Sequence, residues 1–151
     1  MNRSSDTFNS FFIEMIIVIL FFAISSAVTL RLFVAADSRA NQSSDLSAAV
    51  IKAQDIAEQI QGISSPNELP PALRAAKRTN SGGTQHFQIG YDRQWNETSA
   101  APRYAAEVSV AKTGSGSGVL VRADISVFRI ESGGRKQIFA LSPAKYLPKT
   151  A

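Results

Sequence analysis

Residues 11–30 read FFIEMIIVILFFAISSAVTL, and this stretch decides how the rest of the chain is organised. It contains one charged residue, Glu14, and neither glycine nor proline. A helix of about twenty apolar residues, rising about 1.5 Å per residue, spans about 30 Å, the thickness of the hydrocarbon core of a bilayer. The stretch therefore predicts a transmembrane helix.

Glu14 is the unusual feature of this stretch. A charged residue at the centre of a membrane-spanning helix costs about 2.5–3.5 kcal/mol on insertion scales, so a carboxylate there is a candidate functional group. Glu14 lies only three residues inside the apolar run, where its side chain can reach toward the lipid headgroups. Two interpretations stay open: a carboxylate that binds a partner, and a solvated carboxylate at the membrane interface.

The start of the apolar run resembles the N-terminus of type IV pilins and type II secretion pseudopilins. Residues 10–15, SFFIEM, followed by an unbroken apolar helix, carry this resemblance. It implies that Glu14 takes the place of the family's glutamate, which neutralises the N-terminal amine of a neighbouring subunit. It also implies that Phe11 and Phe12 take part in subunit assembly with Glu14, and that other pilin-like subunits and an assembly platform are the partners.

The processing site departs from the family pattern. The family has Gly at the last leader position and Phe at the first mature position, where this chain has Asn9 and Ser10. We therefore expect most of the protein to keep its leader. Signal-peptide cleavage is the alternative, because Val34-Ala35-Ala36 is an A-x-A-like site, although the apolar run exceeds the roughly 7–15 residues usual in signal peptides.

Composition divides the chain at Gly62, since all nine Gly and all six Pro lie at or after this residue. A continuous helical half followed by one small, turn-rich domain is predicted. Residues 1–62 carry four Lys/Arg and six Asp/Glu, a net charge of −2, whereas residues 63–151 carry twelve and six, a net charge of +6. The basic half fits an anionic surface polymer or DNA, or it is an ordinary solvated surface.

An apolar stripe predicts that the helix continues beyond the membrane-spanning part to Gln61. Its members recur at spacings of three and four residues, which places them on one helical face: Leu46, Val50, Ala53, Ile56, Ala57 and Ile60. Asp45 falls outside this stripe, and Gly62 supplies a C-cap. We expect the stripe to pack on the chain's own sheet; a coiled coil with a partner helix is the alternative.

The rest of the chain predicts a connector and an antiparallel sheet. The connector covers residues 63–84 and includes a short helix near residues 72–77. Alternating apolar residues predict strands at 87–91, 104–110, 119–127 and 137–141, with a bulge near Val127 where the alternation changes phase. Short loops between them favour a meander. The predicted fold class is α+β: a polar leader (1–10), a transmembrane helix (11–30), its amphipathic continuation (31–62), the connector (63–84) and a small antiparallel sheet domain (85–151).

Loose motifs in the second half resemble small pilin-like proteins of clostridial pilus operons. They are residues 91–95, YDRQW, residues 138–141, IFAL, and the pair Lys145-Tyr146. The aromatic residues Trp95 and Tyr146 are either ligand-binding side chains or fillers at the edge of the sheet.

No motif in the sequence predicts catalysis, a metal site or a cofactor. His86 is the only histidine and there is no cysteine, so neither a metal-ligand set nor a catalytic triad has a recognisable pattern. We expect a non-enzymatic, single-pass membrane protein, with its N-terminus in the cytoplasm, its sheet domain outside, and no small-molecule substrate. The alternative is a membrane-tethered binding module whose basic sheet holds an anionic ligand.

Overall fold

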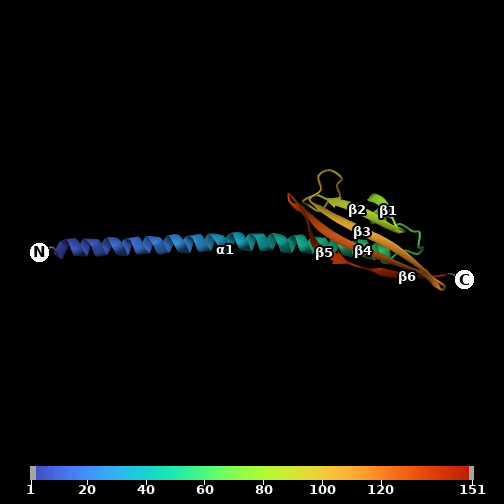
Figure 1. The fold of residues 1–151 in the computed structure, drawn as a ribbon, viewed down its shortest axis with the longest axis horizontal. Coiled ribbons are helices and arrows are strands. Elements are labelled where there is room, and N and C mark those ends of the chain that lie inside the picture. The colour runs from blue at the N-terminus through green and yellow to red at the C-terminus, as the bar shows by residue number, and fades with distance from the viewer. Residues whose placement is uncertain (1–2, 150–151) are drawn as a thin grey trace. The chain divides into compact units, whose positions relative to one another are not determined.

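A computed structural model describes residues 3–149 of the chain, with side chains from Ser10 onward except that of Ser115. The chain forms two compact units that divide after Ser43. The protein has the predicted α+β fold: one long N-terminal helix followed by an antiparallel sheet (Figure 1).

Helix α1 spans Arg3–Gln61, and its first part makes up the described portion of the N-terminal unit. The predicted helix is confirmed, but it begins at Arg3, so most of the predicted polar leader is helical as well. Met1 and Asn2 lie outside the described residues. Helix α1 is long and apolar enough to cross a membrane, and its most apolar part is not buried within the protein.

The second unit holds the last turns of α1, a one-turn helix and a six-stranded sheet. Helix α2 covers Pro71–Arg74. The strands are β1 (Lys77–Ser81), β2 (Thr84–Tyr91), β3 (Tyr104–Ser115), β4 (Gly118–Glu131), β5 (Gly134–Leu141) and β6 (Ala144–Pro148). The first five strands are neighbours in chain order, and all pairings are antiparallel, as the short loops predicted. Strand β6 also pairs with β4, along the part of β4 that β5 does not reach.

Two strands were not predicted, and each lacks the alternation that identified the others. All five side chains of β1 are exposed, because it is an edge strand within the segment predicted to be a connector. Strand β6 buries only Leu147. The bulge expected near Val127 is confirmed, since the register between β4 and β5 shifts between Val127 and Phe128.

The core lies between the end of α1 and one face of the sheet. Helix residues Ala53, Ile56 and Ile60 are buried there, as the apolar stripe predicted. Their neighbours in the same cluster are sheet residues, among them Phe87, Ile89, Val108, Val121, Ala123, Ile125 and Val127. The helix ends at Gln61, next to the expected C-cap, but Gly62 does not adopt the left-handed conformation of a glycine C-cap; its N–H continues the helical pattern by donating to the carbonyl of Glu58 at 2.9 Å.

The stripe prediction was wrong at its beginning. Leu46 is 44% exposed and Val50 is only partly buried, whereas Ala49, which was not predicted, is fully buried. The reason is that the side of α1 that faces the sheet carries Ala49 and Ala53, and it begins at Asp45, which bonds to the sheet. Leu46 follows Asp45 directly and therefore lies off this side of the helix.

Candidate functional site

The apolar run of α1 carries the predicted assembly residues. Phe11 and Phe12 are exposed, and their rings contact each other edge to face with centroids 6.4 Å apart. The large apolar side chains from Phe11 to Leu30 are exposed in the same way. Exposed apolar surface on this scale is covered in a working protein by lipid or by other protein.

Glu14 lies on this apolar run with an exposed side chain. No described residue of the chain forms an ion pair or hydrogen bond with it. A carboxylate in apolar surroundings needs a cationic or hydrogen-bonding partner. If lipid or protein covers this part of α1, that partner has to come from outside the described chain.

The predicted processing position falls partly outside the described side chains. Ser10 is exposed within α1, and the backbone of Asn9 belongs to the same helix, while the Asn9 side chain lies outside the described part. The alternative cleavage site at residues 34–36 also lies within the uninterrupted helix.

An ionic network that the sequence did not predict ties α1 to the sheet. The hydroxyl of Tyr104 donates to Asp45 Oδ1 at 2.7 Å, and Arg129 Nη1 donates to Asp45 Oδ2 at 3.0 Å. Arg129 also binds Glu131 at 2.6 Å. The bonds to Glu131 and to Asp45 raise the pKa of Arg129, and burial, followed by the hydrogen bond to Asp45, raises the pKa of Tyr104.

The position of Asp45 could have been recognised from helical geometry. Asp45 lies four residues before Ala49 and therefore on the same face of α1. The sequence predicted Asp45 to lie off the apolar face, because Leu46 and Val50 were assigned to that face. The contact between α1 and the sheet is polar at Asp45 and apolar from Ala49 onward.

The aromatic residue Trp95 is part of this end of the sheet and is packed within the protein. Its ring stacks on Tyr104 with centroids 4.1 Å apart and planes inclined by 13°, and the centroid of the Tyr91 ring lies 5.9 Å from that of Trp95. Lys52 of α1 lies over the Tyr91 ring, 5.4 Å from its centroid. Burial is the main cause that raises the pKa of Tyr91 to about 12, with Glu97 and Asp55 adding to it. Trp95 therefore fills the edge of the core.

Asp92 holds the turn that presents Trp95. Its Oδ1 accepts the backbone N–H groups of Gln94 at 2.8 Å and Asn96 at 2.9 Å, and the Trp95 N–H donates to the Asp92 carbonyl at 3.2 Å. The bond from Asn96 is the largest cause that lowers the pKa of the Asp92 carboxyl below its ordinary 3.8. Trp95 itself has φ 62°, a conformation that needs such local support.

Replacing Asp92 with alanine is expected to loosen this turn and unstack Trp95 from Tyr104. Trp95 is the only tryptophan, so its fluorescence emission should move to longer wavelength and become easier to quench. Acid should act on the wild type in the same way. The carboxylate's contribution is complete above its ordinary pKa and is lost as the pH falls through its lowered folded-state pKa.

The matched control is Asp124→Ala, which removes an exposed carboxylate that accepts a hydrogen bond from Ser142, away from the turn. Its emission at neutral pH should stay that of the wild type. Unchanged emission from Asp92→Ala at neutral pH would show that the turn does not depend on Asp92.

Tyr146, the second predicted aromatic residue, is 47% exposed on β6. Its hydroxyl lies 2.9 Å from Ser117 Oγ, and its ring covers the start of β4, where a side chain at Gly118 would clash with it. Tyr146 thus packs along a strand edge with part of its ring accessible.

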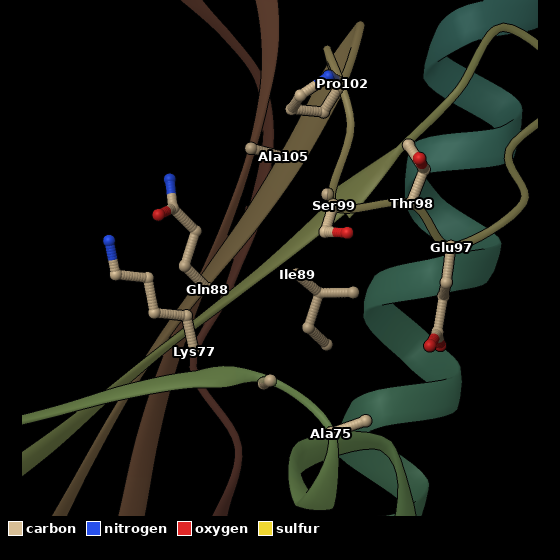
Figure 2. A pocket seen from close by; sticks show the side chains of 11 residues that line it. Ala75, Lys77, Gln88, Ile89, Glu97, Thr98, Ser99, Pro102 and Ala105 are labelled. Atoms are coloured by element: carbon tan, nitrogen blue, oxygen red, sulfur yellow. The ribbon is translucent and has the colours of Figure 1, made fainter.

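A groove opens beside β2, where β1 stops pairing (Figure 2). It has a volume of about 530 Å³ and is bounded by three segments. These are residues 75–77 at the start of β1, residues 88–90 of β2, and the loop residues 97–102, with Ala105 beneath. Figure 2 shows Lys77 and Gln88 on one wall and Glu97, Thr98 and Ser99 on the opposite wall.

Gly90 is required at the foot of this groove. A Cβ atom there would lie 2.5 Å from the carbonyl oxygen of Thr98 and 2.9 Å from Pro102, so the loop can approach only a glycine. The approach is fixed by a hydrogen bond from the Thr98 N–H to the Gly90 carbonyl, at 2.8 Å.

The only histidine does not complete a catalytic arrangement among the described residues. His86 Nδ1 lies 2.9 Å from Ser109 Oγ, and Ser109 lies opposite Asp124 on the neighbouring strand. Ser109 thus lies between His86 and Asp124, whereas a Ser-His-Asp triad needs the histidine in the middle. The described part of the chain also holds no cluster of three or more His, Asp or Glu side chains that could hold a metal ion.

The predicted basic surface carries both signs of charge on the sheet face turned away from α1. Arg122 and Asp124 are successive exposed residues of β4 on this face. Arg135 forms an ion pair with Glu107. The cations of this face are therefore interleaved with carboxylates.

Comparison with known proteins adds no family to these observations. No protein-family model, no curated protein and no solved structure matches the chain.

Proposed function

We propose that the protein is a non-enzymatic, pilin-like or pseudopilin-like structural subunit of a membrane-embedded assembly. The observation that carries the proposal is Glu14, a carboxylate without a described partner on an exposed apolar helix that is long enough to cross a bilayer. A helix of this kind gains most from packing against copies of itself or against related helices, where each carboxylate can meet a cation.

The arrangement of the rest of the chain supports the same role. The end of α1 is built into the core of a small antiparallel sheet, so a subunit held through its apolar helix carries a folded domain with it. The resemblance of residues 10–15 to pilin and pseudopilin N-termini supplies the orientation: N-terminus in the cytoplasm and sheet domain outside. The partners are then other pilin-like subunits and the platform that assembles them.

Single cysteines placed in the apolar run test the proposal. The chain has no cysteine of its own, so Ile17→Cys and Ile24→Cys give one reactive site each. In membranes of the native host, mild oxidation should join these variants into disulfide-linked dimers or into disulfides with another subunit. Ser132→Cys, in the exposed β4–β5 turn, serves as the control for random collisions.

Monomeric Ile17→Cys and Ile24→Cys after oxidation, at normal membrane levels, would contradict the proposal. That outcome would instead favour a membrane-tethered domain that acts alone.

A further inference from the structure

A second cavity is bounded by the connector residues 66–70, the end of α1, α2 and the face of the sheet that packs on α1. Its volume is about 270 Å³. The buried part of its lining is apolar and includes Ile60, Ile63, Leu73, Phe87, Val110 and Val121. The exposed part is polar and carries two cations, Arg78 and Lys112, and one carboxylate, Glu68. The cavity therefore has an apolar interior and a charged mouth.

Both cations lie on the same face of the sheet as the apolar interior. Arg78 pairs with Phe87 across β1 and β2, and Lys112 pairs with Val121 across β3 and β4. Residues that are directly paired on neighbouring strands have their side chains on the same face. Phe87 and Val121 are buried in the core, and the guanidinium of Arg78 lies over the Phe87 ring, 5.9 Å from its centroid.

Both cations also keep N–H donors for a ligand. Lys112 Nζ donates to Asn67 Oδ1 at 3.2 Å, which uses one of the three donors of the ammonium group. Arg78 Nε donates to Asn80 Oδ1 at 3.3 Å, and the two terminal nitrogens of Arg78 bond to no described residue. The mouth can thus donate several hydrogen bonds without breaking those that hold its side chains.

Positive charge predominates at this mouth. Arg78 and Lys112 contribute +2 and Glu68 contributes −1, a net charge of +1. Glu68 is already engaged, since its Oε2 accepts a backbone N–H of the connector at 2.7 Å. Lys145, which is paired with Val121 from the side opposite to Lys112, lies on the same face and adds positive charge nearby. An anionic group is therefore favoured at the mouth.

We propose that this cavity binds a medium-chain aliphatic carboxylate. Its carboxylate lies at the mouth, where Lys112 and Arg78 supply N–H donors, and its alkyl chain fills the apolar interior. A dry apolar cavity of about 150 Å³ holds a ring of six carbon atoms, so this one has room for a chain of roughly six to ten. The proposal departs from the expectation that the chain has no small-molecule ligand, and it stands independently of the proposed assembly role.

Charge and polarity select this ligand class over others. An alkylammonium ion would meet net positive charge at the mouth, and an inorganic anion would leave the apolar interior unfilled. The carboxyl end of a peptide offers the same charge, but it brings an amide group that costs free energy to bury against an apolar lining.

Titration with hexanoate, followed by NMR of the full ¹³C-methyl-labelled chain in detergent micelles, tests the proposal. Hexanoate should shift the methyl resonances of Val110 and Val121 but not those of Val127, which is buried in the core outside this cavity. Hexanamide, which keeps the chain and loses the charge, should bind about tenfold more weakly. Acetate, which lacks four methylene groups, should bind about a hundredfold more weakly. Unmoved Val110 and Val121 resonances, or equal binding of hexanoate and hexanamide, would overturn the proposal.

N-acetylleucine distinguishes a free aliphatic acid from the carboxyl end of a peptide. It should bind about tenfold more weakly than hexanoate, because its amide group lacks a full set of partners in the interior. Tighter binding of N-acetylleucine than of hexanoate would assign the cavity to a peptide end and overturn the proposed ligand class.

A variant at the mouth tests the contact with the carboxylate. Lys112→Met should weaken hexanoate binding about tenfold and leave hexanamide binding unchanged, because only the charged ligand loses a charge-assisted hydrogen bond. Lys77→Met, which removes a cation of β1 from the opposite face of the sheet, should bind both ligands like the wild type. The spectra also show whether each variant is folded. Equal losses of both ligands with Lys112→Met would mean that Lys112 only shapes the cavity, which would overturn the assigned contact.

Discussion

Replacing Ile56 with alanine is expected to lower the free energy of unfolding of the C-terminal unit by about 2–5 kcal/mol. Ile56 is 1% exposed and belongs to the cluster that joins α1 to the sheet. Truncation removes three buried carbon atoms and leaves a cavity, because the surrounding strands are held in register and collapse only partly. Few other single changes in the chain should cost as much.

Thermal unfolding of residues 41–151, followed by circular dichroism, measures this effect. The unfolding midpoint of Ile56→Ala should fall by roughly 10 °C or more. Gln54→Ala, an exposed change on the same helix, should leave the midpoint unchanged, and Val50→Ala should give a smaller decrease because Val50 is only partly buried. If Ile56→Ala and Gln54→Ala were equally mild, the helix face would not form the core of the unit.

Replacing Glu14 with alanine is expected to leave membrane insertion intact, or to improve it, while preventing most of the recruitment into the assembly. Insertion should not decrease, because a charged residue in an apolar helix raises the free energy of membrane insertion by up to about 2.5–3.5 kcal/mol, and this cost is removed. Recruitment should decrease, because a cation of a neighbouring subunit would lose its carboxylate partner in the water-free interior of the membrane. Glu14→Gln should behave like Glu14→Ala, since it keeps the shape and removes the charge.

Both Glu14 variants are best made in the Ile17→Cys background, where disulfide formation reports assembly and membrane fractionation reports insertion. Glu58→Gln, which removes an exposed carboxylate from the last turns of α1, is the matched control and should crosslink normally. Normal crosslinking of either Glu14 variant would make Glu14 an interfacial carboxylate. The proposed function would then rest on architecture alone.

Much of the fold was predictable because it follows from periodicity. The uninterrupted helix follows from the absence of Gly and Pro before Gly62, and β2, β3, β4 and β5 follow from alternation of apolar residues. Strands β1 and β6 were missed, since edge strands do not need to alternate. The bulge beside Val127 was also predictable, because the alternation of apolar residues changes phase there.

The features at the ends of the sheet were not predictable in the same way. The bonds from Asp45 to Tyr104 and Arg129 join residues 59 and 84 positions apart, and no local pattern indicates such a pairing. The groove is likewise made by three separate segments and by the place where β1 stops pairing with β2. Glu14 is the opposite case, since a single charge in an apolar run is conspicuous from the sequence alone.

The order of the elements along the chain has a consequence for synthesis on the ribosome. The apolar face of α1 is complete at Ile60, but the central strand β4 reaches Val121 only 61 residues later. At about 5–20 residues per second, this leaves the helix face without its cover for roughly 3–12 s. During this interval the nascent helix carries two apolar surfaces, one suited to lipid and one suited to the sheet. Engagement of residues 11–30 by the insertion machinery would cover only the first surface, so the second stays uncovered until the sheet has been made.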